Sequence, residues 1–256
     1  MWNAFMAWRR KRLLTRRPLP DAVWTRAVAQ QPLMRMLSFR ELARLRELAT
    51  ILIAEKRFVG ARGLLLTEEM KTEIALLACL PILELGIDWY GGWSTIIVYP
   101  DEFYPRHEEI DEDGIYHVDA SAWSGEAQDG GPVILSWAGI EADRAGGPGS
   151  LVIHEFAHKL DMRSGGANGC PPLHQGMSGK SWQQVFRAAW ADLRIRAEAG
   201  EETQIDPYAA SDPAEFFAVA CEWFFTAPAE LHAAWPCLYD QLMLFFRRDT
   251  LHQLAW

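Results

Sequence analysis

Apolar residues recur at helical spacing along the first part of the chain, with arginine and glutamate between them. Within residues 21–54 this spacing predicts two helices. The apolar positions that carry the pattern include Leu37, Leu42, Leu45, Leu48, Ile51 and Leu52. A further helix is predicted from Thr67, whose side chain can cap it ahead of Glu68 and Glu69, through Leu85 and into Gly86.

The pattern changes after Gly91 and Gly92 to short runs rich in β-branched residues. Residues 95–99 and 133–137 are predicted strands, the first closed by Pro100. Helical spacing then returns in four stretches, which are 151–161, 182–199, 213–225 and 228–247. The sequence therefore predicts an α+β fold, mostly helical, with a small mixed or antiparallel sheet packed against the helix at 151–161.

Length and composition favour one domain over residues 1–256. Half of the residues are hydrophobic, enough for a sizeable core. We expect a helical N-terminal region at residues 1–85 and a catalytic core at residues 86–256. The net charge of −9 offers no footprint for direct nucleic-acid binding.

Cysteine usage and the apolar runs bear on location. The four cysteines are scattered without a CxxC pair, which predicts a reduced cytoplasmic protein. No secretion signal is apparent, and no apolar run reaches the roughly 20 residues of a membrane span. We therefore expect a soluble protein without stable membrane insertion.

Two charged segments allow alternatives. The basic segment 9–17 is interleaved with aromatic and leucine residues, and a solvated, partly frayed helical arm is favoured over contact with an anionic membrane or a partner. The acidic stretch 108–131 is interpreted as a solvated hairpin tip or loop rather than a calcium site.

The motif His154-Glu155-Phe156-Ala157-His158 carries the candidate chemistry. Residues i and i+4 of a helix project from one face, so His154 and His158 can bind one zinc ion. Glu155 then lies beside the metal, where its carboxylate can act as general base. A chance occurrence would bury these polar groups without a shared partner, at a cost of roughly 1–3 kcal/mol each.

A catalytic zinc usually takes a third protein ligand. Glu215 and Glu222 are the downstream candidates; they are seven residues apart on one helix face, and the one that does not bind metal could brace a ligand or pair with arginine. Asp161, three residues after His158, is expected either to accept an imidazole N–H or to form a salt bridge at the helix end. A purely structural zinc site is disfavoured because no cysteine is suitably spaced.

Over most of its length the sequence resembles the Mlc titration factor A family of bacterial zinc peptidases. The resemblance rests on HEFAHKLD at 154–161 and on DPYAASDPAEFFAVACEWFF at 206–225. The metal-binding helices are also similar to those of the anthrax lethal factor catalytic domain. Both resemblances imply a zincin-like fold, with Glu215 as third ligand of one Zn²⁺ per chain. Glu222 is then expected behind the metal ligands or in the core.

The resemblance also implies roles beyond the metal. Tyr208 would hydrogen-bond the developing oxyanion, and the substrate would be a peptide, cut by an aminopeptidase that prefers small N-terminal residues. The family name implies a partner as well, a glucose-responsive transcriptional repressor of sugar phosphotransferase genes. The alternative is a non-catalytic protein that sequesters this repressor and carries a vestigial or regulatory zinc site.

Overall fold

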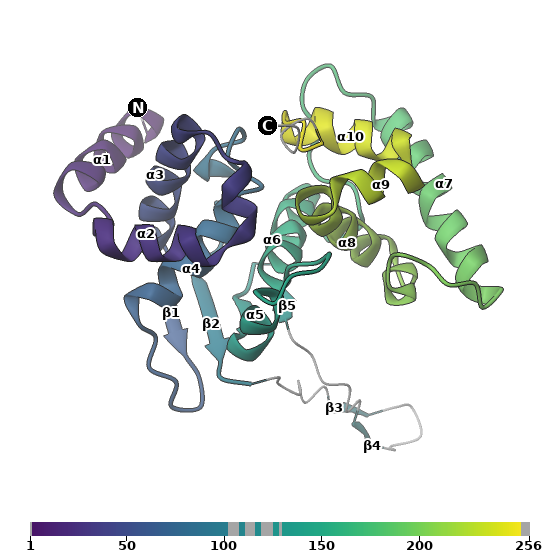
Figure 1. Cartoon of the computed structure of the whole chain (residues 1–256), viewed down its shortest axis with the longest axis horizontal. Helices are drawn as coiled ribbons and strands as arrows, with labels where there is room; N and C mark the ends of the chain where they lie inside the picture. The colour runs from purple at the N-terminus through teal and green to yellow at the C-terminus, as the bar shows by residue number, and fades with distance from the viewer. Residues whose placement is uncertain (1, 102–107, 111–115, 119–124, 128–129, 252–256) are drawn as a thin grey trace.

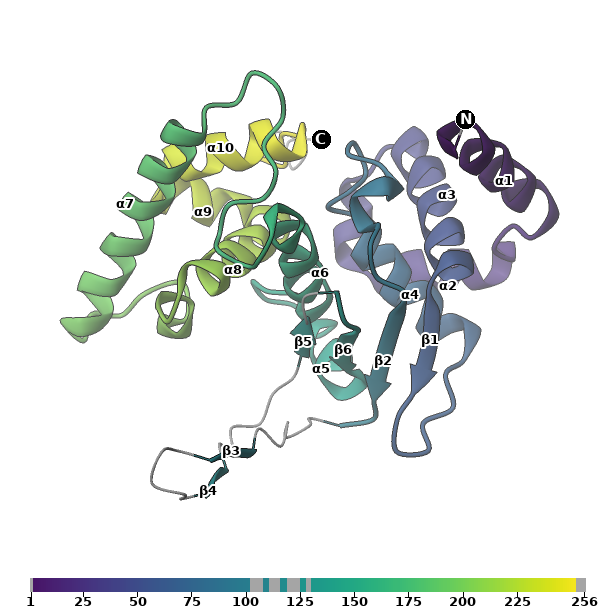
Figure 2. The same cartoon turned by 180° about the vertical axis from the view of Figure 1, so that it is seen from behind.

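The computed structural model of the chain describes residues 2–101, 108–110, 116–118, 125–127 and 130–251. Helices at the two ends of the chain lie on opposite sides of a central region that contains the sheet and helix α6 (Figure 1, and from behind in Figure 2).

Two helices of the N-terminal side begin at side-chain caps. Ser38 and Glu41 form a reciprocal capping box at the start of α3, and the Thr67 side chain accepts the Met70 N–H at the start of α4. The elements are α1 (Trp2–Arg16), α2 (Asp21–Gln30), η1 (Pro32–Met36), α3 (Phe39–Glu55), α4 (Glu68–Cys79) and η2 (Ile87–Tyr90).

The main sheet is mixed, which confirms one of the two predicted forms. Its order is β1-β2-β6-β5; β2 pairs in parallel with β1 and β6, and β5 is antiparallel to β6. The strands are β1 (Arg57–Gly60), β2 (Thr95–Tyr99), β5 (Gly125–Ala127) and β6 (Val133–Ser136). Helix α6 (Leu151–Asp161) packs on β5 and β6, as the sequence predicts.

Among the remaining helices, α8 packs along α6, and α7, α8 and α10 contribute to an aromatic cluster. Phe217, Phe245 and Trp182 pack against one another at 5.6–6.5 Å between ring centroids. The elements are α5 (Trp137–Asp143), η3 (Met162–Ser164), α7 (Gly179–Glu198), η4 (Pro207–Ala210), α8 (Pro213–Thr226), α9 (Pro228–Ala234) and α10 (Pro236–Phe246).

Two predicted helices are wrong in extent, and proline is the reason in both. Helix α4 ends at Cys79 rather than running to Leu85, because Pro81 has no N–H to continue the ladder. The stretch predicted as one helix from Pro228 is two, because Trp235 leaves the helical conformation and Pro236 starts α10.

A buried ion pair connects the N-terminal helices to the segment that precedes α6. Glu73 of α4 is only 2% exposed, and Arg144 at the end of α5 binds both of its carboxylate oxygens at 2.6 Å. Gln31 donates a further bond of 2.8 Å to the same carboxylate. One hydrophobic cluster likewise includes residues from Leu19 to Phe246.

The acidic stretch lies mostly outside the described residues. Its described parts include β3 (Glu108–Ile110) and β4 (Tyr116–Val118), which form an antiparallel pair, and β5 of the main sheet. The choice between loop and calcium site therefore stays a prediction. Across the described parts of the chain, no helix is both long and apolar enough to cross a membrane.

Candidate metal centre

Helix α6 brings His154 and His158 together. The helix starts after the Gly-rich segment 146–149, and Ser150 caps it by accepting the Ile153 N–H. One helical turn separates the two histidines, and their Nε2 atoms approach to 3.2 Å. The pair is largely shielded from solvent, with side chains 16% and 10% exposed.

Helix α8 supplies the third group, Glu215, from 57 positions further along the sequence. Asp212 caps this helix by accepting the N–H groups of Ala214 and Glu215 at 2.7 and 3.1 Å. Because α8 packs along α6, the Glu215 carboxylate lies 3.3 Å from each histidine Nε2. His154, His158 and Glu215 are the His/Cys/Asp/Glu group in the described residues whose donor atoms could converge on one ion.

The donor separations are of the size expected around one metal ion. Zinc binds histidine nitrogen and carboxylate oxygen at about 2.0–2.1 Å, so two ligands at a tetrahedral angle are about 3.4 Å apart. Here the two Nε2 atoms are 3.2 Å apart, and each lies 3.3 Å from a different oxygen of the Glu215 carboxylate. Two imidazoles and one carboxylate are also a donor set that zinc accepts in catalytic sites.

The charges at this centre favour a cation. Burial would lower the pKa of His154, but the nearby carboxylates of Glu222 and Glu215 outweigh it and raise that pKa well above its usual value. Burial likewise opposes ionisation of Glu215, yet hydrogen bonds from His154 and His158 hold its pKa well below the usual range. The anionic carboxylates thus surround the position between the two imidazoles.

Glu222 braces the first histidine. Its Oε1 lies 2.7 Å from Nδ1 of His154, and its Oε2 accepts the Ser150 N–H at 2.7 Å. Gly149 permits this approach: its φ is +119°, and a Cβ there would lie 3.3 Å from the Glu222 carboxylate. Of the two candidates that the sequence left open, the structure therefore brings Glu215 to the imidazole Nε2 atoms and Glu222 to the outer nitrogen of His154.

Replacing Glu222 by glutamine is expected to weaken metal affinity by roughly 10–100-fold, because it removes the charge that orients His154 and increases its basicity. Competition of the purified protein with a chromogenic chelator measures this. Glu230→Gln, on the exposed start of α9, is the matched control and should not change the affinity. Equal affinities for wild type and Glu222→Gln would contradict the bracing role.

Within the described residues, Asp161 has neither of its expected contacts. It is fully buried, and its carboxylate accepts the N–H groups of Asn168, Gly169 and Cys170 at 2.7–2.8 Å. Among the described residues, His158 Nδ1 has no hydrogen-bond partner. The physical reason is that the loop after α6 turns back and presents three amides, which together satisfy a buried carboxylate.

The two residues expected to act in catalysis, Glu155 and Tyr208, both lie near the group of His154, His158 and Glu215. Glu155 is 3% exposed, and its charge contributes to raising the pKa of His154. Tyr208, in η4, is 57% exposed. Burial and the charges of Glu215, Asp212 and Glu155 raise the pKa of its phenol, which keeps the hydroxyl protonated as a donor.

Sequence reasoning missed Asp143. Its carboxylate accepts the N–H of Leu151 at 2.8 Å and so holds the first turn of α6. Burial raises its pKa to about 6, a backbone hydrogen bond from Leu151 opposes this, and the charge of Glu222 adds to it. An acidic residue shortly before a predicted helix is a weak signal. Here the Gly-rich segment 146–149 separates Asp143 from the helix, so the sequence does not indicate that the two are in contact.

Comparison with known proteins relates the chain to a family of metallo-peptidases. The chain matches the family described as glucose-regulated metallo-peptidase M90 over residues 5–247. It is 38% identical over 226 residues to Mlc titration factor A of Yersinia pestis (strain Pestoides F), covering 87% of this chain and 83% of the relative. The same values hold for the Mlc titration factor A of Yersinia pseudotuberculosis serotype O:1b (strain IP 31758).

Proposed function

Because this chain belongs to the glucose-regulated metallo-peptidase M90 family, we propose that it is a zinc-dependent peptidase that hydrolyses peptide bonds with one zinc ion per chain. The observation that carries the proposal is the convergence of the donor atoms of His154, His158 and Glu215, with the buried Glu155 beside them. Three protein ligands are typical of catalytic zinc, whereas structural sites are closed by four.

In this proposal His154, His158 and Glu215 hold the metal, and Glu222 fixes the orientation of His154. A bound zinc ion supplies Lewis acidity, which makes water acidic and polarises a carbonyl group. The Glu155 carboxylate accepts the proton of the attacking water and passes it to the nitrogen of the leaving amine. The Tyr208 hydroxyl donates a hydrogen bond to the oxygen that becomes negative in the transition state.

Removal of the metal tests the proposal directly. Dialysis against a chelator is expected to abolish hydrolysis of alanine-p-nitroanilide, and one equivalent of zinc should restore it. Metal content, measured by mass spectrometry on the same samples, should rise with the rate and level off at one per chain. A rate that survives complete metal removal would exclude the proposed mechanism.

We assign the peptidase to N-terminal residues with small side chains, on the resemblance described above. N-acetylalanine-p-nitroanilide distinguishes an aminopeptidase from a peptidase that does not need a free N-terminus, because blocking the amine removes the group that an aminopeptidase must recognise. Cleavage of the free substrate alone supports an aminopeptidase. Equal cleavage of both would mean that the chain does not recognise an N-terminus.

A second function, binding of a repressor, is supported by the name of the relatives, Mlc titration factor A. We propose that this chain binds a glucose-responsive repressor of the Mlc type in the cytoplasm. The four described cysteines are free thiols, which fits a reducing compartment. Binding needs no turnover, so a catalytically silent variant should still capture the repressor in a gel-filtration assay if the partner surface lies outside the metal centre.

A further inference from the structure

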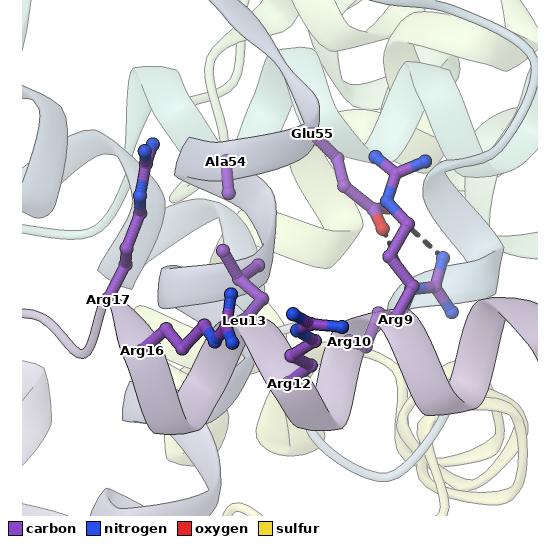
Figure 3. A pocket seen from close by; sticks show the side chains of 8 residues that line it. All are labelled: Arg9, Arg10, Arg12, Leu13, Arg16, Arg17, Ala54 and Glu55. Carbon is purple, nitrogen blue, oxygen red and sulfur yellow. Dashed lines mark hydrogen bonds and ion pairs between the residues drawn. The ribbon is translucent and has the colours of Figure 1, made fainter.

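Helix α1 concentrates positive charge in a chain whose net charge is −9. Figure 3 shows the pocket of about 230 Å³ that it forms with the end of α3. Five arginines line this pocket, four from α1 and one, Arg17, directly after it. Glu55 is the carboxylate among the lining residues. The lining residues are Arg9, Arg10, Arg12, Leu13, Arg16, Arg17, Ala54 and Glu55.

Arg10 fixes the helix to the body of the protein. It binds both carboxylate oxygens of Glu55, at 2.9 and 3.1 Å, and Asp88 at 2.6 Å. Leu13 and Leu14 pack against the hydrophobic core from the same side. The segment is thus the exposed helix that was expected, but these contacts hold it against the body of the protein. The carboxylate of the pocket is already paired.

The exposed face of α1 combines aromatic rings with three of the arginines that also line the pocket. Phe5, Trp8, Arg9, Arg12 and Arg16 recur at helical spacing and are exposed. Phe5 and Trp8 are 52% and 55% exposed and stack at 6.1 Å, and the Arg12 guanidinium lies 5.4 Å above the Trp8 ring. Within the described parts of the chain, no carboxylate forms an ion pair with Arg9, Arg12, Arg16 or Arg17.

We propose that this face of α1 docks the protein on the surface of an anionic lipid bilayer. Guanidinium groups match phosphate oxygens in geometry and charge, so the arginines would bind lipid headgroups. Phe5 and Trp8 are the kind of side chain that enters the boundary between headgroups and acyl chains beside basic residues.

The aromatic pair distinguishes a bilayer from other polyanions. Free phosphate would use the arginines alone, and duplex nucleic acid offers its phosphates without an apolar layer for two exposed rings. The rest of the acidic chain does not cancel the attraction, because charges beyond about 8–10 Å are largely screened at physiological salt. The interaction is peripheral, since a helix of 15 residues is too short to span a bilayer.

Sedimentation with vesicles tests the proposal on the full chain. We expect binding to phosphatidylcholine vesicles that contain phosphatidylglycerol, weakening with salt, and none to phosphatidylcholine alone. Each arginine near an anionic surface changes partitioning about fivefold. The triple variant Arg9→Gln/Arg12→Gln/Arg16→Gln should therefore bind on the order of a hundredfold more weakly.

Two further variants keep the result specific. Arg187→Gln/Arg194→Gln/Arg196→Gln removes the same charge from exposed positions on α7 and should bind like wild type. Phe5→Ser/Trp8→Ser keeps every charge and should bind vesicles on the order of tenfold more weakly.

Three outcomes would overturn the proposal. One is undiminished vesicle binding by the α1 arginine variant. Another is full vesicle binding after loss of both aromatic rings, which would indicate charge attraction alone. The third is absence of vesicle binding by wild type, whether or not the same arginines bind inorganic phosphate or a DNA duplex.

Discussion

Glu155→Gln is expected to lower the rate of peptide hydrolysis by on the order of a thousandfold while zinc stays bound, because the general base contributes about 10²–10⁴-fold to such reactions. Glutamine keeps the size and shape of the buried side chain but cannot accept the proton of water. His154, His158 and Glu215 remain unchanged in this variant. Steady-state kinetics with alanine-p-nitroanilide, together with zinc analysis of the same preparation, measures both quantities.

The control for this experiment is Glu202→Gln, an exposed position outside the centre, which should match wild type. If Glu155→Gln loses zinc along with activity, Glu155 supports the metal rather than acting as base. If it keeps both, the assignment of the base is wrong. Repressor capture by the same variant then tests the second function, since loss of capture would place the partner in the metal cleft.

Arg144→Met is expected to destabilise the whole chain by about 3–5 kcal/mol, because it leaves the Glu73 carboxylate buried without its cation. We propose that the helical region at residues 1–85 and the core at residues 86–256 form a single domain. Chemical unfolding followed by circular dichroism should then show one transition, shifted as a unit. Two transitions, with only one of them shifted, would mean that the two regions unfold independently.

Two variants show whether the effect comes from the unpaired charge. Glu73→Leu/Arg144→Met removes both ions and should be clearly more stable than Arg144→Met alone. Arg44→Met breaks the exposed pair with Glu47 and should cost no more than about 1 kcal/mol. A double variant as unstable as Arg144→Met would point to lost packing instead.

Local patterns in the sequence were sufficient where neighbouring residues determine the structure. The strand at 95–99, the start of α6 at Leu151 and the facing pair His154 and His158 all follow from spacing and caps within one element. The helix ends at Cys79 and Ala234 were less predictable, because apolar spacing continues past both. Pro81 and Pro236 indicated these ends, but the prediction gave more weight to the apolar spacing than to the prolines.

Contacts between distant segments could not be derived in this way. Spacing left Glu215 and Glu222 equivalent, since both lie on one face of α8, and only the packing of α8 on α6 separates their positions. Asp161 failed as a prediction because its amide partners belong to an irregular loop without periodicity. Site assignments that depend on tertiary packing thus needed the resemblance or the structure.

The contacts between α6 and α8 have a consequence for the metal-free protein. Helix α8 contacts α6 and the residues just before it at three levels: Thr226 accepts the Gly149 N–H, Glu222 accepts the Ser150 N–H, and Glu215 lies beside the two histidines. None of these contacts requires a metal ion. Little conformational entropy should then be lost on metal binding. Small zinc-nucleated domains unfold when their ion is removed. This protein should instead remain a folded acceptor that can lose and regain zinc without refolding.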